Sequence, residues 1–318
     1  MRFQLTEDQR ALRDGVRGLL AARFGRERLR DAVETAGAAG LDRGLWRELG
    51  AAGFFSLRLP EAAGGVGLGL PEAVLAFEEA GRVLLPGPLI ATHLAAGAVP
   101  GAATGETVVT LVDSGGVVEW LEAADVVRGD ETGEVAGAAV SMRSVDPLTP
   151  LHRVGDGVGD GVGDRVPSDP DSDDSDCTDV LLASLLTAAE QLGTAARVCE
   201  LAVQHARTRE QFGRPIGAFQ AVQHLCAGML VRTEVARAAV YAAAVTADPA
   251  DIAAARLLAD EAAVRGARDC VQVYGGMGFT WESDVHLYLK RAWVRARRPG
   301  SLTECEELLA AELLAELR

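Results

Sequence analysis

The sequence has 318 residues, of which 48% are apolar and 5% aromatic, and its formal net charge is −15. An acidic chain of this kind is not expected to bind nucleic acid or an anionic membrane surface. Alanine and leucine are abundant, which favours helix. The first residues carry charges throughout with no continuous apolar run, so the sequence predicts a cytoplasmic protein with neither a signal peptide nor a membrane span.

Five cysteines are spread along the chain, at positions 177, 199, 226, 270 and 305. None forms a C-x-x-C pair, and none lies near a histidine at metal-ligand spacing, so no metal site is expected. Cys199, Cys226 and Cys270 lie among alanine, leucine and valine in helical patterns. We expect them to be buried thiols in a reducing compartment.

The first part of the chain predicts helices at 5–24, 42–52 and 71–84. Thr6 is followed three residues later by Gln9, the pattern of a capping box. Apolar residues then recur at helical spacing. We therefore predict a helical N-terminal domain over residues 1–102.

Residues 106–148 consist of short β-branched stretches separated by glycine, which predicts strands. A V-G-D repeat and an Asp/Ser/Pro tract follow at 153–179, and this composition predicts a loose or disordered loop. Its D-x-D spacing also occurs in calcium loops, but the glycine and terminal glutamate of an EF-hand are absent. Residues 103–179 are thus predicted to form a reduced β domain with an acidic flexible loop.

Residues 180–318 predict five helices, at 180–208, 218–247, 250–273, 284–297 and 302–317. Long helices joined by short connections are typical of a bundle. The expected fold class is therefore mainly α with a small β domain.

Three stretches carry a resemblance to the acyl-CoA dehydrogenase family: residues 45–69 (LWRELGAAGFFSLRLPEAAGGVGLG), 207–229 (RTREQFGRPIGAFQAVQHLCAGM) and 272–292 (QVYGGMGFTWESDVHLYLKRA). The order helix, strand, helix agrees with it. The resemblance implies a helical N-terminal domain, a middle β domain and a C-terminal four-helix bundle. It also implies α,β-dehydrogenation of an acyl thioester in fatty acid or lipid catabolism. In that reaction a carboxylate removes the α-proton, and the β-hydride moves to FAD and on to an electron-transfer flavoprotein-like acceptor.

In the family, FAD lies extended between subunits. The resemblance assigns Arg209 to the FAD pyrophosphate and Phe212 to the ribityl or adenine end. Without it, this stretch reads as an ordinary helix–helix loop with an exposed arginine. Gln220 and His224, one helical turn apart, are weaker candidates and could equally be helix-end polar groups.

The glycine cluster that follows Gln272 could be taken for a dinucleotide loop. A helix is predicted before it and no βαβ unit surrounds it, so a Rossmann site is a poor interpretation. The resemblance instead assigns Gln272, Gly275 and Gly276 to a backbone approach to the FAD diphosphate of a neighbouring subunit, where a side chain would obstruct contact.

The catalytic base is where the chain departs from the family pattern. The resemblance places the usual glutamate at Pro299, within Arg298-Pro299-Gly300-Ser301, and proline cannot accept a proton. Some members carry the base on the first bundle helix, where this chain has Glu190 among inward-facing leucines. The alternative is that Glu190 is a buried carboxylate paired with an arginine such as Arg232 or Arg237.

The middle segment lacks the stretches that hold the flavin ring in the family. The leading hypothesis is therefore a dehydrogenase subunit that completes a partner's FAD site, in a dimer or an α2β2 tetramer. A second hypothesis is a self-sufficient homo-oligomeric dehydrogenase that uses Glu190 as base. A third is a flavin-free protein with this fold, acting as a scaffold or in biosynthesis on a carrier-bound acyl group.

Overall fold

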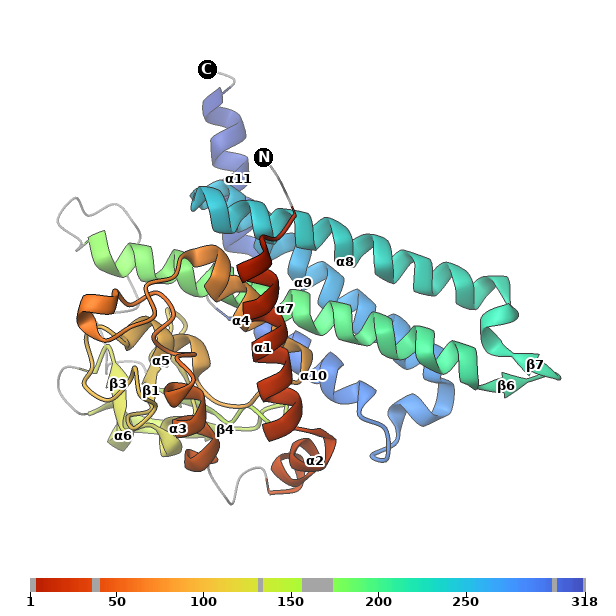
Figure 1. Cartoon of the computed structure of the whole chain (residues 1–318), viewed down its shortest axis with the longest axis horizontal. Helices are drawn as coiled ribbons and strands as arrows, with labels where there is room; N and C mark the ends of the chain where they lie inside the picture. The colour runs from red at the N-terminus through yellow and green to blue at the C-terminus, as the bar shows by residue number, and fades with distance from the viewer. Residues whose placement is uncertain (1–3, 36–40, 131–133, 156–173, 299–301, 317–318) are drawn as a thin grey trace. The chain divides into compact units, whose positions relative to one another are not determined.

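The computed structural model describes residues 4–35, 41–130, 134–155, 174–298 and 302–316 (Figure 1). The chain divides into two compact units, each assembled from separate stretches of sequence. Unit 1 consists of residues 1–20, 74–84 and 185–318, and unit 2 of residues 21–73 and 85–184. The domain boundaries after residues 102 and 179 stay a prediction.

Unit 1 is helical. The helices that lie wholly or partly in it are α1 (Glu7–Arg23), α4 (Leu70–Arg82), α7 (Asp174–Thr208), α8 (Gln220–Thr246), α9 (Pro249–Tyr274), α10 (Val285–Arg295) and α11 (Leu302–Glu316). α9 packs against α8, α10 and α11, and much of its buried surface is alanine, which allows close helix packing. These elements confirm the helices predicted from apolar periodicity.

Local side-chain hydrogen bonds define where two of these helices begin. The Gln9 backbone N–H donates to Thr6 Oγ1 and the Thr6 N–H donates to Gln9 Oε1, both at 3.1 Å. The predicted capping box is therefore confirmed. At α9, Asp248 accepts hydrogen bonds from the backbone N–H groups of Ala250 and Asp251, and Pro249 occupies the first turn.

The helices wholly in unit 2 are short: α2 (Arg26–Glu34), α3 (Arg43–Ala51), η1 (Glu61–Ala63), α5 (Leu89–Ala95), η2 (Leu121–Ala123) and α6 (Val135–Ala138). Trp46 of α3 packs on Phe55 with ring centroids 4.6 Å apart, and both side chains are buried. α2 is not among the predicted helices, because this helix buries only Leu29 and Val33 and its N-cap, Gly25, makes no side-chain hydrogen bond.

The strands of unit 2 form two small sheets. β1 (Val109–Leu111) pairs in parallel with β3 (Val126–Arg128). β5 (Leu151–Val154) lies between β2 (Val117–Glu119) and β4 (Ala139–Met142), antiparallel to both. Val118, Val135 and Val154 form a small apolar core here. The prediction of short strands in this region is confirmed.

Two details differ from the sequence predictions. Residues 135–138 form the helical turn α6, not a strand, because the Asp130 carboxylate accepts hydrogen bonds from the N–H groups of Glu134 and Val135 and stabilises a turn. Within the predicted loose segment, residues 153–154 belong to β5 and 174–179 to α7. Residues 156–173 lie outside the described residues.

None of the cysteines that the structure describes forms a disulfide; Cys199, Cys270 and Cys305 are buried, whereas Cys226 is half-buried. Burial raises the pKa of Cys199 to about 11 and that of Cys270 to about 12. None of the helices within the described ranges is both long enough and apolar enough to cross a bilayer.

Candidate functional site

A tight hairpin joins α7 to α8 (Figure 1). β6 (Glu210–Gln211) pairs with β7 (Arg214–Pro215), and η3 (Ile216–Ala218) leads into α8. The two turn residues, Phe212 and Gly213, both have positive φ, at 54° and 76°. Positive φ at both central positions is typical of a type I′ turn, where the first of them is usually asparagine, aspartate or glycine.

Phe212 occupies this turn at a cost. A non-glycine residue in the left-handed region is destabilised by about 1–2 kcal/mol. Its side chain is 91% exposed, and its ring approaches the Phe219 ring edge-on, with the centroids 6.0 Å apart. The isolated chain therefore gains little from a large aromatic residue here, and such a residue is expected to be covered by a ligand or another subunit.

A second exposed turn follows α9. Gly275 has a φ of 61° and ends the helix, and η4 (Gly275–Phe279) continues from it. A Cβ built at Gly275 or Gly276 would meet no atom within 4 Å, so the backbone of this turn is open to approach. The cluster follows a helix, which confirms that it is not the strand-to-helix loop of a Rossmann fold.

A ring contact brings the two turns to the same end of unit 1. His205, in the last turn of α7, stacks on Tyr274, the last residue of α9, with ring centroids 4.0 Å apart. The six residues that the family resemblance assigns to the cofactor are all exposed in this region: Arg209, Phe212, Gln220, Gln272, Gly275 and Gly276. Segments more than sixty residues apart in sequence thus meet at this end of unit 1.

The apolar side chains beside the glycine turn were not predicted as site residues from the sequence. Met277 is 48% exposed, Phe279 77% and Trp281 60%. Lys290 Nζ lies 4.4 Å from the centroid of the Trp281 ring, a cation–π contact. The signal was present in the stretch GMGFTWES, where large apolar residues alternate with small and polar ones and do not follow a helical period.

Glu190 lies elsewhere, inside unit 1. Its side chain is buried and its Oε2 lies 2.8 Å from Arg295 Nε of α10. Glu190 therefore has an arginine partner, as the alternative interpretation expects, but this partner is Arg295. Arg232 pairs with Asp269 instead, and Arg237 pairs with Glu78. An arginine partner favours the charged form of a carboxylate and reduces its tendency to take up a proton.

Next to this ion pair, further buried polar groups connect α7, α9 and α10. Gln191 Nε2 donates to Asp260 Oδ1 at 2.7 Å, and Arg256 Nε donates to Asp260 Oδ2 at 2.9 Å. Arg256 Nη2 also donates to the Arg295 carbonyl oxygen at 2.6 Å. Glu190 therefore belongs to a polar network that joins helices. Pro299, the position where the family resemblance expects the base, lies outside the described residues.

Comparison with known proteins matches both ends of the chain to one family. A family model described as "Acyl-CoA dehydrogenase, N-terminal domain" matches residues 6–107, and one described as "Acyl-CoA dehydrogenase, C-terminal domain" matches residues 182–300. Strands β1–β5 lie between these two ranges. Neither matched range includes the middle segment.

Two curated relatives match over nearly their whole length. The acyl-CoA dehydrogenase IpdE2 of Mycobacterium tuberculosis is 36% identical and covers 96% of this chain and 98% of its own. IpdE2 of Mycolicibacterium smegmatis is 32% identical over 97% of this chain and 100% of its own. Among solved structures, the ChsE4–ChsE5 complex from M. tuberculosis superposes with a TM-score of 0.82 at 26% identity, covering 99% of both chains.

Proposed function

Because the chain belongs to the acyl-CoA dehydrogenase family, oxidoreductases that act on CH–CH bonds, we propose that it is a subunit that completes the FAD site of a partner subunit. The observation that carries the proposal is Phe212, which is held exposed in a left-handed conformation at the same end of unit 1 as an open glycine turn. This arrangement has a cost in the isolated chain, and it suits an extended ligand held by another subunit.

The residues at this end of unit 1 fit the outer part of FAD. The Arg209 side chain can donate hydrogen bonds to a pyrophosphate, since the guanidinium presents several N–H groups in one plane. The Phe212 ring offers a flat apolar surface to an adenine or ribityl group. Gly275 and Gly276 leave room for a diphosphate to approach the backbone, and the exposed Gln272 adds a polar side chain.

FAD, when bound, supplies the hydride acceptor for oxidation of an acyl thioester. In this proposal the present chain positions the cofactor and the partner supplies the base that removes the α-proton. Two facts support that division: proline stands at position 299, and Glu190 is engaged with Arg295. The similarity to a chain of the ChsE4–ChsE5 complex, which contains two different subunits by its name, supports a mixed oligomer.

The proposal is tested in the complex that this chain forms with its dehydrogenase partner subunit, identified by co-purification. Arg209→Gln removes the pyrophosphate donor, and Gly276→Val places a side chain on the open turn. Each is expected to weaken FAD binding by about tenfold or more while the complex still assembles. For Arg209→Gln the reason is that a hydrogen bond to a charged group contributes about 1.5–3 kcal/mol, and for Gly276→Val it is that the side chain obstructs the approach of the diphosphate to the backbone. The measurement is the FAD content of the purified complex during stepwise dilution.

Two matched substitutions serve as controls. Arg265→Gln removes an exposed arginine of α9 that pairs with Glu261, and Gly18→Val alters an open glycine of α1. Both should leave FAD binding unchanged. The proposed role would be wrong if Arg209→Gln and Gly276→Val retained FAD as well as these controls did.

A further inference from the structure

Unit 2 contains a pocket of about 510 Å³ that is separate from the residues assigned to FAD. Three segments line it: the stretch after α3, the α5 region and the first turns of α7. Apolar side chains from all three segments form its walls, among them Phe55, Leu94 and Leu182. Its volume is within the range of small-molecule sites, which are mostly apolar with a few polar groups that fix orientation.

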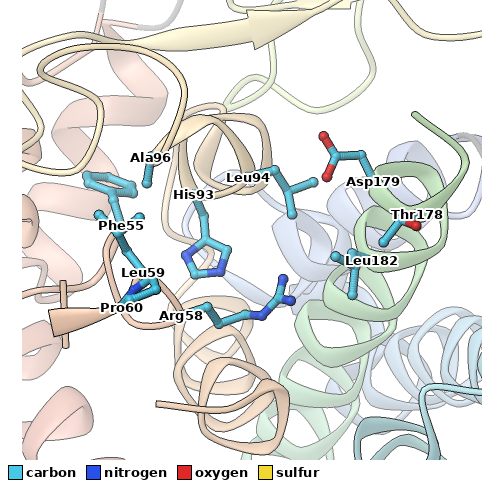
Figure 2. Close-up of a pocket in the computed structure, with 11 residues that line it drawn as sticks. Phe55, Arg58, Leu59, Pro60, His93, Leu94, Ala96, Thr178, Asp179 and Leu182 are labelled. Atoms are coloured by element: carbon cyan, nitrogen blue, oxygen red, sulfur yellow. The ribbon is translucent and has the colours of Figure 1, made fainter. Parts of the chain in front are cut away.

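Arg58 provides a positive charge in this pocket. Figure 2 shows its guanidinium extending between the His93 ring and Leu182. Among the residues that the structure describes, none makes a hydrogen bond or an ion pair with this guanidinium. Partial burial lowers the pKa of Arg58, and the charge of Asp179 opposes that shift. A guanidinium in this position presents donors to whatever enters the pocket.

Asp179, the acidic residue that lines the pocket, is engaged with another arginine. Its Oδ2 accepts a hydrogen bond from Arg128 Nη1 of β3 at 2.7 Å. In Figure 2 its carboxylate reaches toward Leu94 and does not point directly at the Arg58 guanidinium. Asp179 therefore leaves the donors of Arg58 available, while its negative charge limits how much further negative charge the pocket can accept.

His93 contributes a neutral group at physiological pH. The side chain is buried, and burial lowers its pKa to about 4, with the Arg58 charge acting in the same direction. Hydrogen bonds with the backbone of Phe54 and Phe55 partly oppose this shift and fix the ring. Near pH 7 the pocket thus combines one unneutralised guanidinium, a neutral imidazole and apolar walls.

We propose that this pocket binds a small monocarboxylate with an apolar body, whose carboxylate pairs with Arg58 and whose body contacts Phe55, Leu94 and Leu182. A planar guanidinium matches a carboxylate in a bidentate arrangement. A phosphate monoester carries nearly two negative charges near pH 7 and would meet a single arginine beside the Asp179 carboxylate, which disfavours it. The site does not depend on the role proposed for the glycine turn.

Calorimetric titration of the whole protein with 4-phenylbutyrate at pH 7 tests the proposal. Three comparisons identify what is recognised: the neutral 4-phenylbutanamide, the dianionic phenyl phosphate and the Arg58→Met variant. The amide and the variant should each show about tenfold or more weaker binding, because each removes the charged pair. Phenyl phosphate should bind more weakly than 4-phenylbutyrate.

Two further variants distinguish binding of 4-phenylbutyrate in the pocket from nonspecific binding elsewhere on the protein. Arg153→Met removes an exposed arginine of β5 outside the pocket and should bind 4-phenylbutyrate as the unmodified protein does. Leu94→Trp fills the pocket and should abolish binding with Arg58 still present. The proposal is overturned if the unmodified protein does not bind 4-phenylbutyrate at millimolar concentration, or if it binds the amide or the phosphate equally well. It is also overturned if the Arg58→Met variant binds 4-phenylbutyrate as tightly as the unmodified protein does.

Discussion

Glu190 and Arg295 form an ion pair inside unit 1, with Oε2 and Nε 2.8 Å apart and neither side chain more than 6% exposed. Removing one member of a buried pair leaves the other charge uncompensated, which costs about 3–5 kcal/mol. We therefore expect Glu190→Leu to lower the free energy of unfolding by about that amount in urea denaturation. The double variant Glu190→Leu/Arg295→Met should recover a large part of the loss.

The same pair distinguishes the structural role of Glu190 from a catalytic one. Glu190→Gln keeps the shape and part of the hydrogen bonding, so the folded variant should oxidise acyl-CoA in the assembled complex at nearly the unmodified rate. The measurement is turnover with a dye acceptor, alongside the flavin spectrum. A folded, flavin-loaded Glu190→Gln complex without activity would instead support Glu190 as the base.

Close backbone packing between α4 and α7 gives a second prediction. A Cβ at Gly193 would overlap the carbonyl oxygen of Glu78, and one at Gly81 would overlap that of Glu190. Gly193→Ala should therefore destabilise the protein by about 1–3 kcal/mol, the usual cost of overpacking. Gly18→Ala on α1, where a Cβ meets nothing within 4 Å, should be neutral or stabilising by up to about 1 kcal/mol. Equal thermal midpoints for the two variants would contradict this packing.

His93 predicts a pH dependence of stability. Its pKa is lowered from 6.5 to about 4 in the folded protein, mainly by burial. Between those values the unfolded chain binds the proton and the folded chain does not, so stability rises with pH across this window and falls as pH decreases from 6.5 to 4. The change is on the order of 3 kcal/mol for one such group. His93→Gln should lose that part of the dependence, measured by urea unfolding at pH 4.5 and 7; an unchanged slope would contradict it.

Phe212 predicts a conflict between stability and cofactor binding. Its φ of 54° suits glycine, so Phe212→Gly should stabilise the isolated chain by up to about 1–2 kcal/mol and weaken FAD retention in the complex. Ala247→Gly is the control, since Ala247 also has a positive φ, of 52°, at the end of α8. It should stabilise the chain and leave FAD retention unaffected. A Phe212→Gly complex that retains FAD fully would remove the reason for keeping the aromatic side chain.

The helical parts of the fold could be predicted from sequence because their signals are local. The Thr6–Gln9 capping box and the Asp248–Pro249 start of α9 each lie within a few residues, and apolar periodicity covers the rest. α2 was not predicted because its two buried residues give too little periodicity. α6 was not predicted because the Asp130 carboxylate accepts hydrogen bonds from the backbone N–H groups of Glu134 and Val135, which override the β-like composition. Unit 1 also combines distant stretches, which no local pattern reveals.

The site residues divide in the same way. The glycine cluster and the Arg209–Phe212 stretch could be identified from their sequence motifs. The His205–Tyr274 stack, which joins the end of α7 to the end of α9, is a tertiary contact that no motif reveals. The partner of Glu190 could be predicted in kind and not in identity, since Arg232, Arg237 and Arg295 all lie on helices whose faces the sequence does not orient. In the sequence Arg58 is a single charged residue in an apolar stretch, and its proposed role as a ligand-binding residue becomes visible only from the pocket that it lines.

The measurement that tests the central claim most directly is the visible absorbance spectrum of the protein purified alone and purified with its dehydrogenase partner subunit, at equal protein concentration. If this chain completes a partner's flavin site, the protein alone has little or no flavin absorbance, and the complex shows the flavin bands together with acyl-CoA oxidation. Full FAD occupancy and turnover by this chain as a homo-oligomer would contradict the account.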